Sequence, residues 1–128
     1  MAPAFIKLVK QATDYDCGIA CLAMLFHLPL AEVHAVAAKA LKVWPDAEGL
    51  TNRKLQTIAR KLGHPLKAMD PKDTAAGDTG ILMVGGNKKY HFVVVFKGVI
   101  VEPTYGDIWE LDAYLKMYKV RPHRFLQP

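Results

Sequence analysis

CGIACLAMLFHL, residues 17–28, is apolar on nearly every side when it is drawn as a helix. A helix without a polar face is typically buried in a protein core. Asp16 is placed to cap the start of this helix, and Pro29 to end it. The sequence therefore predicts a buried helix near the beginning of the chain, with Cys17 in its first turn.

Two more helices are predicted after this one. The first covers about residues 30–41 and is rich in alanine. The second covers about residues 52–62, with Thr51 as its N-cap and Gly63 as its stop signal. Its apolar side chains recur at helical spacing, which indicates one buried face.

Beyond Asp70 the sequence changes character. Residues 71–80 are polar and contain glycine, which indicates a connecting loop, and short β-branched and aromatic runs follow. The predicted strands are residues 80–84, 90–96, 99–103 and 120–125, and a short helix is predicted at 112–118. Lys97-Gly98 lies where a tight hairpin turn fits. Because the predicted helices come first along the chain and the predicted antiparallel strands follow, we expect an α+β fold.

Length and composition narrow the class of protein. A chain of 128 residues that is 52% hydrophobic fits one compact domain over residues 1–128, helical to about 70 and sheet from about 80. No run reaches the roughly 18 apolar residues of a membrane-spanning helix, and no signal peptide is evident. We expect a cytoplasmic protein without a cofactor. A net charge of +5 with dispersed lysines and arginines does not demand a nucleic-acid ligand.

The two cysteines, Cys17 and Cys21, are four residues apart. On one helix their Cβ atoms would be about 5–6 Å apart, whereas a disulfide needs roughly 3.5–4.5 Å. We therefore expect two free thiols, which suits a reducing compartment. The spacing does not match the common zinc motifs, so no metal site is expected.

Cys17 is the candidate nucleophile. The unpaired N–H groups and the dipole of a helix N-terminus favour a thiolate. Gly18 follows it and would let a substrate backbone approach. Gln11 lies six residues earlier, and its side-chain amide and the backbone N–H of Cys17 could together bind an oxyanion. A lone cysteine in an apolar helix is usually structural, but the combination with Gln11 is more specific.

Five histidines could act as the base for Cys17. His27 is ten residues along the same predicted helix, about 15 Å away, and is excluded. His91 opens the run HFVVVF, so it would stand at the end of a buried strand, where a ring is held rigidly. His91 is therefore the preferred base.

An imidazole base needs a third group that fixes its orientation. Glu102 lies on the next predicted strand. A two-residue turn at Lys97-Gly98 places Glu102 on the same face as His91 and diagonal to it, and a turn one residue earlier places the two directly opposite. A three-residue loop would send Glu102 to the other face. Asp107 is the reserve candidate.

The motif QATDYDCGIACLAM, residues 11–24, closely resembles the active-site segment of the C39 peptidases. These are papain-like domains that cut leader peptides after a double glycine in bacteriocin and related secretion systems. GLTNRKLQTIARKLGH, residues 49–64, is similar to the third helix of that family. HFVVVFKGVIVEPTYG, residues 91–106, is similar to its catalytic hairpin. The resemblance covers most of the chain.

The resemblance implies a papain-like fold with Cys17 as nucleophile, His91 as base and Gln11 as oxyanion donor. It implies that the acidic residue before proline orients His91; here that residue is Glu102, where the family usually has Asp. The expected substrate is a peptide or protein, such as a double-glycine leader, and the protein is expected to act either alone or with a transporter in trans. Two alternatives stay open: a papain-like deamidase or acyltransferase, and an inactive module that binds peptide or nucleic acid.

Overall fold

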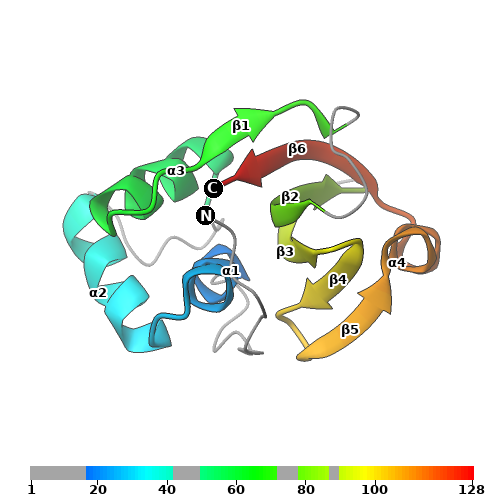
Figure 1. Ribbon diagram of the computed structural model, residues 1–128, viewed down its shortest axis with the longest axis horizontal. Coiled ribbons are helices and arrows are strands. Elements are labelled where there is room, and N and C mark those ends of the chain that lie inside the picture. Colours follow the sequence, from blue (N-terminus) through cyan, green and yellow to red (C-terminus); the bar gives the residue numbers. More distant parts are fainter. Residues whose placement is uncertain (1–16, 42–49, 72–77, 87–89) are drawn as a thin grey trace.

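A computed structural model of the chain describes residues 17–41, 50–71, 78–86 and 90–128 (Figure 1). Three helices come first: α1 (Cys17–Phe26), α2 (Leu30–Ala40) and α3 (Asn52–Lys61). The elements that follow are β1 (Lys67–Met69), β2 (Thr79–Gly85), β3 (Tyr90–Phe96), β4 (Val99–Glu102), β5 (Asp107–Glu110), α4 (Leu111–Tyr118) and β6 (Arg121–Gln127). The predicted α+β order is confirmed.

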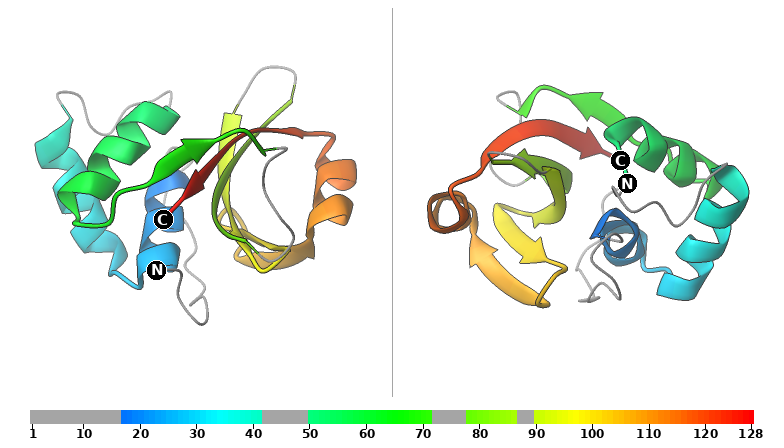
Figure 2. Two further views of the ribbon diagram at one scale, coloured as in Figure 1. Left: turned by 45° about the horizontal axis from the view of Figure 1, so that its top comes forward. Right: turned by 180° about the vertical axis from the view of Figure 1, so that it is seen from behind.

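The strands form one sheet in the order β1-β6-β2-β3-β4-β5, and every neighbouring pair is antiparallel. The sheet is strongly curved, with α1, α2 and α3 together on one side of it and α4 on the other (Figures 1 and 2). Among the residues that the structure describes, no helix has the length and hydropathy required to cross a bilayer.

Strand β3 is buried on both faces, which explains the continuous apolar run HFVVVF. Phe92 and Val94 join the core between the sheet and α1, whereas Val93 and Val95 join a second core on the opposite face. Successive strand residues point to opposite faces, so one strand supplies both cores. Tyr114 brings α4 into the second core. His91 therefore shares a face with Val93, Val95 and this helix.

Helix α1 is the buried helix that its sequence predicts. Its residues from Gly18 to Leu25 are all buried. A Cβ atom on Gly18 would lie 2.9 Å from Leu55 Cδ1 and 3.3 Å from Phe92 Cδ2. The glycine thus permits close packing against α3 and β3, which differs from the predicted approach of a substrate backbone. The predicted cap, Asp16, lies outside the described residues.

The turn between β3 and β4 has the predicted length. Phe96 pairs with Val99, so Lys97 and Gly98 alone form the loop. Both have positive φ, 51° and 83°, as a type I′ turn requires. This register puts Glu102 on the same face of the sheet as His91 and diagonal to it.

Two strands are missing from the prediction. Strand β1 (Lys67–Met69) falls inside residues 1–70, which the sequence assigns to the helical part, and β5 (Asp107–Glu110) follows β4. They are the two outer strands of the sheet. With three and four residues they are too short for a clear alternation of polar and apolar side chains. The other boundaries agree with the prediction to within two residues.

Candidate active site

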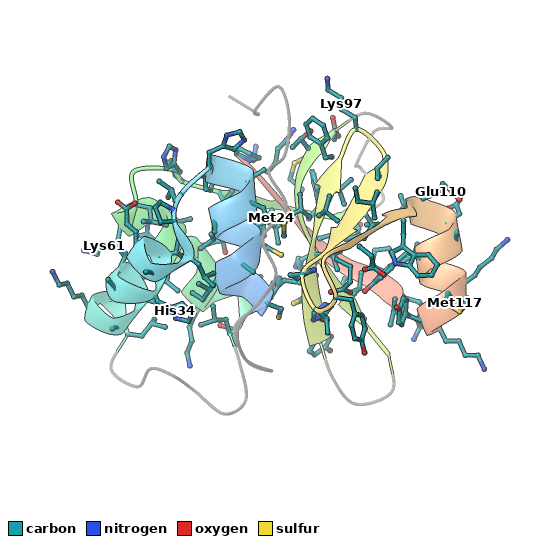
Figure 3. All side chains as sticks on the ribbon, turned by 90° about the horizontal axis from the view of Figure 1, so that it is seen from below. Met24, His34, Lys61, Lys97, Glu110 and Met117 are labelled. Carbon is teal, nitrogen blue, oxygen red and sulfur yellow. The ribbon has the colours of Figure 1, made fainter. Side chains whose placement is uncertain are left out.

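Cys17 and His91 come from different layers of the fold. Cys17 is the first residue of α1 and is half-buried, and His91 is the second residue of β3. In Figure 3, α1 lies directly beside the strands, and α4, which carries Met117, lies on their far side. Cys17 lies close enough to His91 to raise the pKa of the His91 ring. The predicted nucleophile and base are thus brought together.

Glu102 is the acidic partner of His91. The Nε2 atom of His91 lies 2.8 Å from Oε1 and 3.1 Å from Oε2 of Glu102. Both of these contacts use Nε2, so Nδ1 is the ring nitrogen that Glu102 does not contact.

Two further donors hold the Glu102 carboxylate. The backbone N–H of Thr104 donates to Oε1 at 2.8 Å, and the hydroxyl of Tyr114 donates to Oε2 at 2.6 Å. The Thr104 hydroxyl oxygen also lies 3.4 Å from Nε2 of His91. The side chain of Glu102 is only 4% exposed, so these donors replace the water that a buried carboxylate loses.

Sequence reasoning missed Thr104 and Tyr114. Thr104 could have been found, because it lies two residues after Glu102, where a turn lets a backbone N–H reach back to an acidic side chain. Tyr114 gives no such signal. Its contact depends on how α4 packs against the sheet, which the local pattern of α4 does not contain.

His91 and Glu102 form an ion pair at neutral pH. Burial lowers the pKa of His91, but its interactions with Cys17 and Glu102 outweigh the effect of burial and raise the pKa to about 10. Burial raises the pKa of Glu102, but its bond to His91 and the donors Tyr114 and Thr104 lower the pKa to about 2. Between these values the imidazole is protonated and the carboxylate is ionised.

This ion pair predicts a pH window of greatest stabilisation. The contribution of Glu102 is full above its ordinary pKa of 4.5 and is lost as the pH falls toward about 2. The contribution of His91 is full below its ordinary pKa of 6.5 and is lost as the pH rises toward about 10. The difference in unfolding free energy between the wild type and Glu102→Gln should therefore be largest from pH 4.5 to 6.5. Urea unfolding across the pH range measures it, and a pH-independent difference contradicts the ion pair.

Asp107, the reserve candidate, has a different neighbour. Its Oδ2 atom accepts a hydrogen bond from Trp109 Nε1 at 3.1 Å. Its Oδ1 atom is buried and has no hydrogen-bond partner among the described residues. Of the two acidic candidates, Glu102 is the one whose bond to His91 the structure contains.

The remaining predicted residues are placed as follows. Gln11 lies outside the described residues. Cys21 is a free, fully buried thiol whose pKa is raised by burial and by the nearby Cys17 and Glu102. His64 stacks on Phe26, and His123 lies edge-on to Tyr90. Over residues 17–41, 50–71, 78–86 and 90–128, no three histidine, cysteine or acidic residues are grouped so as to hold a metal ion.

A family model matches most of the chain. The model of the peptidase C39 family matches residues 6–109, which include Cys17, His91 and Glu102 and end within β5. A search of the curated proteins finds no match. The matched range covers most of the chain, and α4 and β6 lie beyond it.

Proposed function

This chain belongs to the peptidase C39 family, whose papain-like α+β fold it has, and from that premise we propose that it is a cysteine endopeptidase acting through Cys17, His91 and Glu102. Family membership indicates a cysteine peptidase. The observation that carries the proposal is the hydrogen bond between His91 and the buried Glu102 carboxylate, together with the influence of the nearby Cys17 on the pKa of His91. A thiol beside a cationic imidazole is the reactive pair that peptide-bond cleavage requires.

In the proposed reaction, the Cys17 thiolate attacks the carbonyl carbon of the scissile peptide bond. His91 then gives its Nδ1 proton to the departing amine, the C–N bond breaks, and a thioester remains on Cys17. Neutral His91 next takes a proton from water, whose oxygen attacks the thioester. The carboxylate product leaves, and Cys17 and protonated His91 are regenerated for the next cycle. Throughout both steps Glu102 keeps the His91 ring oriented.

The negative oxygen formed during the attack needs donors. Cys17 begins α1, where backbone N–H groups are not used within the helix, and its own N–H is one proposed donor. The side-chain amide of Gln11 is the second proposed donor. This assignment follows from the resemblance of residues 11–24 to the active-site segment of the family.

The proposed substrate is a peptide or protein cut after small residues, such as a leader that ends in two glycines. Family membership supports a peptide substrate. The proposal places the enzyme in the cytoplasm, where Cys17 and Cys21 would stay reduced, and gives it a transporter as a partner in trans.

Incubating the protein with two synthetic peptides tests this function. One carries Gly-Gly at its centre, and the other carries Leu-Leu in the same context. Mass spectrometry should find fragments ending in Gly-Gly from the first peptide and little from the second. A change in mass without fragments would instead indicate deamidation or acyl transfer, and binding without any change would indicate an inactive module. Either result contradicts the peptidase proposal.

A further inference from the structure

One hydrogen bond ties the candidate active site to α4. Tyr114 is the buried residue of this helix, 2% exposed, and its hydroxyl donates to Oε2 of Glu102 at 2.6 Å. A distance of roughly 2.5–2.7 Å is typical of a hydroxyl that donates to an ionised carboxylate, which is among the stronger hydrogen bonds in proteins. The contact therefore matters more than an ordinary neutral hydrogen bond.

The position of the Tyr114 hydroxyl is fixed by its surroundings. Its ring packs in the second core, 4.8 Å from the ring of Tyr118 and 6.3 Å from that of Trp109, measured between centroids. Burial and the bond to Glu102 raise the pKa of Tyr114, so the hydroxyl remains a neutral donor. A donor held by packing in this way can hold its acceptor in one place.

The Glu102 carboxylate needs such a donor to hold its orientation. It stands at the end of a side chain with three rotatable bonds. The backbone N–H of Thr104 holds Oε1, but a contact with one oxygen does not by itself set the plane of the carboxylate. Tyr114 fixes Oε2. With both oxygens held, the plane of the carboxylate is set, and both oxygens lie within 3.1 Å of His91 Nε2.

We propose that Tyr114 is a positioning residue of the active site, whose hydroxyl holds the Glu102 carboxylate against His91 and so maintains the reactive pair of His91 and Cys17. This inference rests on the proposed function. It adds to that function a residue of α4, an element beyond the part of the chain that the family model matches.

The test is the rate at which iodoacetamide alkylates Cys17 in the wild type and in Tyr114→Phe, followed at pH 6 by peptide mass spectrometry. Phenylalanine keeps the packed ring and removes only the hydroxyl. The rate should fall roughly three- to tenfold, the usual scale of one hydrogen bond. With a cleavable peptide, kcat should fall by a similar factor and KM should stay nearly constant. An unchanged or increased alkylation rate would overturn the inference.

Two comparisons separate positioning from a merely structural effect. Tyr118→Phe, on the same helix and in contact with the Tyr114 ring, should keep the wild-type alkylation rate. In a Glu102→Ala background, Tyr114→Phe should cause no further loss, because the carboxylate on which it acts is gone. An equal loss in both backgrounds would overturn the inference. Thermal unfolding midpoints verify that each variant is folded.

Alkylation does not depend on the substrate, so the two proposals can fail separately. If the wild type cleaves peptides and Tyr114→Phe is unaffected, the role of Tyr114 is wrong and the peptidase proposal stands. If no peptide is cleaved but Cys17 reactivity depends on Tyr114 through Glu102, the peptidase proposal is wrong and Tyr114 still positions Glu102.

Discussion

Replacing Cys17 with alanine is expected to lower peptide cleavage by roughly 10³-fold or more, because no thioester can form without the thiol. The fold should persist. Cys17 is half-buried at the first residue of α1, so the change removes one sulfur atom at the edge of the first core. Circular dichroism and thermal unfolding should match the wild type while fragments disappear from the cleavage assay.

Cys21→Ala is the matched control for this variant. Cys21 lies on the same helix but is fully buried in the first core, so its loss should cost about 1 kcal/mol of stability and leave cleavage within a few-fold of the wild type. Cleavage that survives in Cys17→Ala, or that vanishes equally in Cys21→Ala, would refute the assignment of Cys17 as the nucleophile.

Of the proposed substitutions, Gly80→Ala should lower the free energy of unfolding the most. A Cβ atom at this position of β2 would lie 2.5 Å from the backbone oxygen of Leu126 and 2.7 Å from Phe125 Cζ. The Leu126 oxygen belongs to β6, the neighbouring strand, and cannot move without disturbing the pairing of β2 with β6. The expected loss is about 3 kcal/mol or more, measured by urea unfolding, a large share of the stability of a small domain.

Gly86→Ala provides the comparison. A Cβ atom there would meet Lys119 O at 3.6 Å, an ordinary van der Waals contact. Its unfolding free energy should therefore change by no more than about 0.5 kcal/mol. Similar losses in the two variants would show that general effects of removing a glycine, rather than the close approach of β6 to Gly80, explain the result.

The sequence was sufficient for features that short-range patterns encode. The all-round apolar run 17–28 predicts the buried helix α1, and HFVVVF predicts a buried strand. The Lys97-Gly98 pair predicts the two-residue turn, and from that turn the strand register follows by counting. The contact between His91 and Glu102 was therefore one of the alternatives that the sequence allowed, and the observed register selects it.

Features that depend on packing between distant segments could not be predicted. Strands β1 and β5 are short outer strands whose existence depends on the partners that they pair with. The bond from Tyr114 to Glu102 requires the placement of α4 against the curved sheet. The oxyanion role of Gln11 stays a prediction, since that residue lies outside the described part of the chain.

The two residues of the proposed catalytic pair lie on different layers of the fold, so the pair forms only while the two layers are packed against each other. The Cys17 sulfur belongs to the layer of α1, α2 and α3. The side chains of His91, Glu102 and Tyr114 belong to the sheet and the helix α4 behind it. If the two layers drift apart, each keeps its internal backbone bonds, yet the thiol loses the cation beside it. Peptide cleavage should therefore be lost at a lower denaturant concentration than the circular dichroism signal of the secondary structure.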